Sequence, residues 1–243
     1  MEDLRKIIYE KCYLEREKIS LISKIYDPLF QTTSKLKVRE GYGSIPPNVN
    51  IPLDMIIATT NYDMSLELYF MSNEIYYSDG YTGPSGSLIK KFAPNMLQNA
   101  YNYRHFIIKL HGSIWQFIRN NEMIKTIIDP EKAPIPISIE KEMMIYPTKE
   151  KEILTYQYYP FFNLFKNIKW DSLVVIGYSF RDDPINMAII ENMQLIPTSK
   201  IIVINPDPEK VLDNLEWKIP GERVIKIPGK FGSDEINKEL LEM

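Results

Sequence analysis

The apolar positions of this chain gather in short continuous runs instead of alternating with polar positions. Four of these runs predict strands, and they cover residues 55–58 (MIIA), 106–110 (FIIKL), 172–176 (SLVVI) and 200–204 (KIIVI). A fifth strand is expected within residues 223–229 (RVIKIPG). Continuous apolar strands are typical of a parallel sheet that helices cover on both faces.

Helical patterns lie between these strands. Apolar spacing and helix-start signals predict helices within residues 2–26, 63–70, 156–168, 182–194 and 233–243. Asp63 is suited to cap the second helix, and Asp183 followed by Pro184 suits the start of the fourth. Strands separated by helices predict an α/β fold with a mostly parallel sheet and helices on both of its faces.

The chain is predicted to form a single domain over residues 1–243. Residues 1–50 are expected to form an N-terminal helical segment and a loop, because glycines, prolines and asparagines interrupt regular structure over 39–52. Residues 51–243 are expected to form the core of the domain. A chain of this length can bury a sizeable core.

Charge and hydropathy narrow the class of protein. The formal net charge is −3, so no basic field attracts nucleic acid or an anionic membrane. The apolar runs are too short to span a bilayer, and the charged N-terminus lacks the apolar core of a signal peptide. We therefore expect a cytoplasmic protein that binds neither nucleic acid nor membrane.

Cysteine and histidine are scarce. Cys12 is the only cysteine, which excludes an intrachain disulfide and a zinc site built on paired cysteines. The two histidines, His105 and His111, lack a metal-binding spacing. We expect no metal cofactor.

Small polar residues follow the predicted strands at their C-terminal ends. These strand tips are Thr59-Thr60-Asn61-Tyr62-Asp63, His111-Gly112-Ser113, Gly177-Tyr178-Ser179 and Asn205-Pro206-Asp207. In an open parallel sheet the C-terminal ends of the strands meet along one edge, where ligands bind. The tips therefore predict one shared pocket.

Each tip also has a purely structural interpretation. Asn61 and Asp63 can cap the helix that follows them. His111 can be a hydrogen-bonded core histidine, and Asp182 and Asp183 can be capping residues. The occurrence of such tips after successive strands favours a ligand site over these separate explanations.

Several motifs in this chain resemble those of sirtuin-like NAD-consuming proteins, in their bacterial and archaeal branch. The motifs are TTNYD, KLHGSI, IYPTKEKE, VVIGYSFRDDPIN and IIVINPD, in this order between residues 50 and 207. The resemblance implies a Rossmann-like fold that cleaves the bond between nicotinamide and ribose in NAD. Sirtuins proper pass ADP-ribose to acetyl-lysine, whereas other members use water and act as NAD hydrolases, many of them in antiviral defence.

The resemblance also implies roles for individual residues. Asn61 matches the asparagine that holds ribose or positions the attacking water. His111 matches the catalytic histidine, a general base toward a ribose hydroxyl or water. Asp63 matches the acid that faces the nicotinamide amide. Thr60 and Gly112, in the same motifs, are counted among the cofactor-binding positions.

The second half of the chain supplies the other cofactor-binding positions that the resemblance implies. Gly177 and Ser179 match the glycine and serine that approach phosphate and ribose. Asn205 matches the contact with the adenosine ribose. The expected cofactor is NAD, consumed as substrate, without a metal.

Two departures from the family pattern matter. Deacetylase sirtuins usually carry a four-cysteine zinc module, which a chain with one cysteine cannot build. The family also begins with a glycine-rich strand-turn-helix that receives the diphosphate. No segment before Ile51 matches it, since EGYGS at 40–44 leads into prolines instead of a helix. The sequence thus predicts a sheet truncated at its N-terminal βα unit, and a homo-oligomer or a partner chain that supplies this unit.

Three functions remain open at this point. The leading one is NAD hydrolysis. The alternative is a catalytically inactive interaction or regulatory module that keeps the fold and a relic of the pocket. An NAD-dependent protein deacylase is disfavoured by the missing zinc cysteines.

Overall fold

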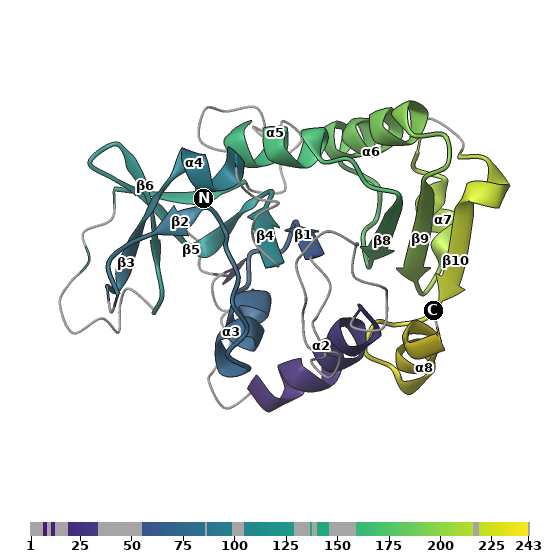
Figure 1. Ribbon diagram of the computed structural model, residues 1–243, viewed down its shortest axis with the longest axis horizontal. Coiled ribbons are helices and arrows are strands. Elements are labelled where there is room, and N and C mark those ends of the chain that lie inside the picture. The colour runs from purple at the N-terminus through teal and green to yellow at the C-terminus, as the bar shows by residue number, and fades with distance from the viewer. Residues whose placement is uncertain are drawn as a thin grey trace, which may run out of the picture. The chain divides into compact units, whose positions relative to one another are not determined.

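The computed structural model divides the chain into two compact units (Figure 1). It describes residues 7–8, 11–12, 19–33, 55–85, 87–98, 105–128, 137, 140–145, 159–215 and 219–242. Unit 1 comprises Met1–Ile22 and Asp54–Phe165, and unit 2 comprises Ser23–Leu53 and Lys166–Met243. Unit 1 contains a strand pair and a five-stranded sheet, and unit 2 contains a three-stranded sheet. Each unit also has an apolar cluster.

Unit 1 contains a parallel strand pair and an antiparallel sheet. Strand β1 (Met55–Thr59) pairs in parallel with β4 (His105–Lys109), and Thr59 lies opposite Lys109. The antiparallel sheet has the order β2-β3-β6-β5-β7. Its strands are β2 (Tyr81–Thr82), β3 (Ile89–Phe92), β5 (Gly112–Arg119), β6 (Glu122–Thr126) and β7 (Lys141–Met144). Three helices complete this part of the chain: α3 (Ser65–Ser72), α4 (Pro94–Gln98) and α5 (Tyr159–Asn167).

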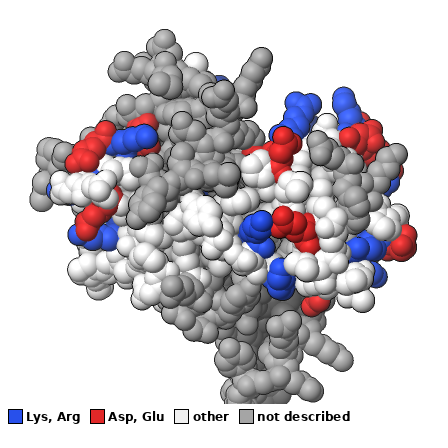
Figure 2. Space-filling model, turned by 90° about the horizontal axis from the view of Figure 1, so that it is seen from above, with Lys and Arg blue, Asp and Glu red and all other residues white. Residues whose placement is uncertain are grey.

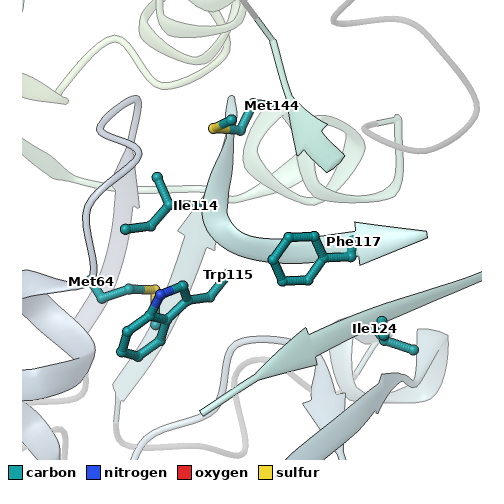
Figure 3. Packing of buried hydrophobic residues seen from close by; sticks show 6 residues of the cluster. All are labelled: Met64, Ile114, Trp115, Phe117, Ile124 and Met144. Atoms are coloured by element: carbon teal, nitrogen blue, oxygen red, sulfur yellow. The ribbon is translucent and has the colours of Figure 1, made fainter. Parts of the chain in front are cut away.

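An apolar cluster fixes strand β5 against the start of helix α3 (Figure 3). Its buried members are Met64, Ile114, Trp115, Phe117, Ile124 and Met144. The Met64 side chain reaches the indole of Trp115, and the Ser113 hydroxyl lies 3.0 Å from the Met64 sulfur. Burying large apolar side chains stabilises a fold by about 1.5–3 kcal/mol each. The cluster therefore holds the start of α3, which follows the tip of β1, against β5, which follows the tip of β4.

Unit 2 is built on a parallel three-stranded sheet in the order β10-β9-β8. The strands are β8 (Ser172–Ile176), β9 (Lys200–Asn205) and β10 (Val224–Pro228). The helices here are α2 (Ile19–Thr33), α6 (Asp183–Leu195), α7 (Pro208–Leu212) and α8 (Asp234–Glu242), with a 3-10 turn at Gly221–Arg223. Ile202, Ile204, Ile227 and Ile236 form the buried cluster between the sheet and α8.

The parallel strands and the helices between them confirm the predicted α/β, Rossmann-like fold class. Two details were not predicted. The strand expected within residues 105–115 is present as β4, but a turn at Leu110-His111 then leads into a further strand, β5. The antiparallel sheet was not predicted, because the strands β3, β6 and β7 are short and carry many lysines and glutamates.

The expectation that every parallel strand is buried on both faces was also wrong for β1 and β8. Ala58 of β1 is exposed, and Val174 of β8 is 39% exposed, whereas β4 is buried throughout. Within the described residues β1 pairs only with β4, and β8 only with β9. In the described part of the chain each of these strands therefore has one paired edge.

Lysine and arginine side chains lie beside aspartate and glutamate side chains on the surface (Figure 2). Two such surface pairs are Lys91 with Glu122, at 2.6 Å, and Lys226 with Glu209, at 2.6 Å. Among the helices that the structure describes, none is long and apolar enough to cross a membrane.

Candidate functional site

The polar tip after β1 lies beside the tip after β4, because the two strands are paired in parallel. The Leu110 amide donates to the Thr59 carbonyl at 2.9 Å, and the Ile114 amide donates to the Tyr62 carbonyl at 3.1 Å. These bonds continue the pairing past the strand ends. The segment that carries Thr60 and Asn61 therefore runs alongside the segment that carries His111.

Asn61 and His111 differ in exposure. Asn61 is exposed, and its backbone amide donates to the Thr59 hydroxyl at 3.0 Å, which turns the chain sharply after the strand. His111 is 9% exposed, and its ring centroid lies 6.4 Å from that of Tyr62. The Tyr62 hydroxyl donates to the Ile145 carbonyl, and the Ile145 amide donates to the His111 carbonyl at 2.9 Å. An exposed asparagine and a buried histidine thus lie in two adjacent strand tips.

Gly112 is required where two backbone segments meet. Its φ is +77°, and a Cβ atom there would lie 1.9 Å from the carbonyl oxygen of Met143. No L-residue side chain fits such a position. The glycine of the HGS motif therefore fixes the turn that places His111 after β4.

Asp63 bonds the first turn of helix α3, as predicted, but it lies one residue before the N-cap position. Its Oδ1 accepts a hydrogen bond from the Ser65 amide at 2.8 Å, at the start of α3. The N-cap position itself is occupied by Met64, whose side chain makes no capping bond. Helix α6 shows a similar shift, since Asp182 and not Asp183 occupies its N-cap position.

Four charged side chains that the sequence analysis did not identify form a buried cluster next to the β1 tip, which one of them contacts at the Asp63 carbonyl. They are Glu67 of α3, Asp79, Lys109 of β4 and Lys125 of β6. Glu67 lies 3.2 Å from the Lys109 ammonium through Oε2 and 3.2 Å from the Lys125 ammonium through Oε1. Lys125 also donates to Asp79, and Lys109 donates to the carbonyl of Asp63.

The charges in this cluster stabilise one another's ionised forms. Burial raises the pKa of the Glu67 carboxyl, but Lys109 and Lys125 outweigh it and hold that pKa below its usual range. Burial lowers the pKa of the Lys125 ammonium, but Asp79 and Glu67 raise it well above its usual range. The only sequence signals are a lysine inside the apolar run FIIKL and a glutamate inside SLELYF.

The tips in unit 2 are partly exposed and held by backbone contacts. Gly177 has φ +64° and donates its amide to the Ile204 carbonyl at 3.0 Å, and no atom lies within 4 Å of a Cβ built on it. Ser179 is exposed, and its carbonyl accepts from the Asn214 side chain at 2.7 Å. The Asn205 Oδ1 accepts from the Asp207 amide at 3.0 Å.

A buried residue with unusual backbone geometry anchors the loop that contains Ser179. Phe180 has φ +52° and is fully buried, although it is not a glycine. The Asn186 side chain donates to the Phe180 carbonyl at 2.9 Å, and its Oδ1 accepts from the Tyr178 hydroxyl at 3.2 Å. Left-handed geometry at such a residue costs about 1–3 kcal/mol and occurs often at functional sites.

The structure brings together one group of the predicted site residues within unit 1 and places the others in unit 2. The unit 1 group is Thr60, Asn61, Asp63, His111 and Gly112, and the unit 2 group is Gly177, Ser179 and Asn205. The convergence of both groups on one pocket stays a prediction. The described residues contain no cluster of three or more histidine, cysteine, aspartate or glutamate side chains that could hold a metal ion.

Parallel strands with polar tips at their C-terminal ends define the Rossmann-like class of ligand-binding α/β domains. Within this class, the chain belongs to the SIR2-like domain family, whose model matches residues 55–225. SIR2-like domains use NAD. No curated protein matches the sequence.

Proposed function

We propose that this chain is an NAD hydrolase that cleaves the nicotinamide–ribose bond, and that it acts in antiviral defence. The observation that carries the proposal is the pairing of β1 with β4, which sets the Asn61 tip beside the His111 tip in a SIR2-like domain. An exposed asparagine beside a largely buried histidine, both at strand ends, suits a reaction that adds water to a sugar.

The reaction breaks one bond and forms one bond. The bond between ribose C1′ and the nicotinamide nitrogen breaks, and its electron pair neutralises the pyridinium. Water then adds to the electron-poor C1′, and we assign its positioning to Asn61 and the acceptance of its proton to His111. Positioned dipoles and a general base within reach of the water suit such an oxocarbenium-like transition state.

The other site residues are proposed to bind the remaining parts of NAD. Asp63 faces the nicotinamide amide, with Thr60 and Gly112 in the same two loops. Gly177 and Ser179 approach phosphate and ribose, and the open space around Gly177 allows a close approach of the backbone. Asn205 contacts the adenosine ribose.

A catalytically inactive interaction module is the second candidate. It is favoured by residues 1–50, which contain no match to the glycine-rich strand-turn-helix that normally binds the diphosphate of a dinucleotide. A partner chain or a second copy of this chain would then complete the sheet. A deacylase function is disfavoured by the single cysteine.

Product analysis separates these functions. We expect purified protein incubated with millimolar NAD to release nicotinamide and ADP-ribose, with no increase when an acetyl-lysine peptide is added. A transfer of ADP-ribose to the acetyl group would indicate the deacylase instead. A folded protein that releases no nicotinamide, alone or in its natural assembly, would indicate the interaction module.

A further inference from the structure

Lys109 is an unusual residue for a strand that is buried throughout. It is 2% exposed within β4, although lysine is rarely buried without a partner. Its ammonium has two partners of different kinds, the Glu67 carboxylate at 3.2 Å and the backbone carbonyl of Asp63. The first partner neutralises the charge, and the second lies in the strand tip that carries Asn61.

The buried charged cluster divides into two neutral pairs. One pair is Lys109 with Glu67, and the other is Lys125 with Asp79, while Glu67 also contacts Lys125. Both pairs are buried, and each joins a lysine of a strand to a carboxylate of another segment. Only the Lys109 pair touches the β1 tip, through the Asp63 carbonyl. Substitution of the Lys125–Asp79 pair is therefore a control for substitution of the Lys109–Glu67 pair, because both are buried lysine–carboxylate pairs.

The carbonyl of Asp63 lies between Tyr62, whose carbonyl accepts from the Ile114 amide, and Met64, which is buried in the apolar cluster. The side chain of Asp63 bonds the Ser65 amide, and the N-cap residue Met64 offers no side-chain bond to the helix. The Asn61 backbone amide donates to the Thr59 hydroxyl, which belongs to the same strand tip. The hydrogen bond from the buried Lys109 ammonium is charge-assisted, and it ties the Asp63 carbonyl to a different element, strand β4.

We infer that Lys109 is a positioning residue that fixes residues 60–63 through the Asp63 carbonyl, with Glu67 as its counter-charge. The consequence for catalysis rests on the proposed function, whereas the fixing of the segment does not. Lys109 itself does not touch substrate in this assignment. It holds Asn61 and Asp63 in the place from which they act.

Paired substitutions separate positioning from stability. We expect Lys109→Met or Glu67→Gln alone to lower the melting temperature by about 10 °C, because each leaves an uncompensated buried charge. The double variant K109M/E67Q removes a neutral pair and should recover most of that loss. The double variant K125M/D79N should behave in the same way.

Hydrogen exchange of the backbone amides over residues 60–65 then gives the deciding result. In K109M/E67Q we expect this segment to exchange about ten-fold faster or more than in the wild type, with no such change in K125M/D79N. Equal exchange of the segment in both double variants would overturn the inference. If a double variant does not fold, hydrogen exchange of the wild type is the test. Amides of residues 60–65 that exchange as fast as those of the exposed turn at Asn120-Asn121 would also overturn the inference.

The rate of nicotinamide release provides the functional result. We expect K109M/E67Q to lose about ten-fold or more in kcat and K125M/D79N to keep its rate, since small misplacements of catalytic groups are costly. A loosened segment with an unchanged kcat would confirm that Lys109 fixes the segment and would overturn its assigned effect on catalysis. A wild type that cleaves no NAD would contradict the proposed function, while the exchange result would still decide whether Lys109 fixes the segment.

Discussion

At the scale of single residues, two glycines of the site have the same backbone handedness but different surroundings. Gly112 and Gly177 both have positive φ, at +77° and +64°. A Cβ atom on Gly112 would collide with the Met143 carbonyl oxygen, whereas one on Gly177 would meet no atom within 4 Å. The first glycine is therefore needed for packing and for backbone geometry, and the second for backbone geometry alone.

Alanine substitution measures this difference. We expect Gly177→Ala to reduce the free energy of unfolding by about 1 kcal/mol, the typical cost of left-handed geometry in alanine. Gly112→Ala should cost more, by about 2 kcal/mol or beyond, because β5 and β7 must also move apart. Urea unfolding of the two variants gives both values. Equal losses would contradict the assigned role of Gly112 as the contact between the strands.

Some site residues could be predicted from the sequence and others could not. Asn61 and His111 follow apolar runs directly, so their positions at strand ends are local features of the sequence. Lys109, Glu67 and Lys125 come together only through the packing of α3, β4 and β6. No local pattern distinguishes a buried lysine from an exposed one, and the cluster was therefore missed.

At the scale of elements, one arginine connects the end of helix α6 to the start of strand β10. The Arg223 guanidinium donates to the carbonyls of Met193, Ile196 and Ser199 at 2.7, 3.0 and 2.9 Å, and to the Ser199 hydroxyl at 2.8 Å. Carbonyl groups at a helix C-terminus lack helical partners, and a cation there also suits the helix dipole. Arg223 therefore acts as a C-terminal cap supplied by another element.

Removal of this cap should destabilise unit 2 without affecting the tips of unit 1. We expect Arg223→Ala to reduce the free energy of unfolding by about 2–4 kcal/mol, since several charge-assisted hydrogen bonds are lost together. Arg223→Lys should recover only part of the loss, because an ammonium cannot reproduce the planar fork of a guanidinium. Chemical unfolding of both variants tests the expectation. A loss below about 0.5 kcal/mol for Arg223→Ala, typical of a surface substitution, would contradict it.

The elements with long apolar runs were the ones that could be predicted. β4, β8 and β9 stand out because their residues are apolar and β-branched. The strands of the antiparallel sheet, such as β3 (IKKF) and β6 (EMIKT), are short and half polar, so their pairing depends on partners distant in the sequence. The register of these strands is set by tertiary contacts, so it cannot be predicted from a short stretch of sequence.

At the scale of the whole molecule, the chain forms two compact units, and the residues assigned to NAD are distributed over both. One domain over residues 1–243, and one pocket shared by Asn61, His111, Ser179 and Asn205, stay predictions. The resemblance in the sequence identified the family correctly over residues 55–225. Residues 40–44, where the sequence offers EGYGS as a weak candidate for the phosphate loop, lie outside the described residues.

The most direct test of the proposed NAD hydrolase compares the two histidines of the chain. His111 lies in the strand tip beside Asn61, whereas His105 is 1% exposed and stacks on Phe70 with ring centroids 5.2 Å apart. Nicotinamide release at saturating NAD should fall by about 10²–10⁴-fold in His111→Ala, the typical contribution of a general base, and strongly in Asn61→Ala. His105→Phe, which keeps an aromatic ring against Phe70, should retain its rate per folded molecule. A folded His111→Ala variant that releases nicotinamide at the wild-type rate would contradict the proposed mechanism.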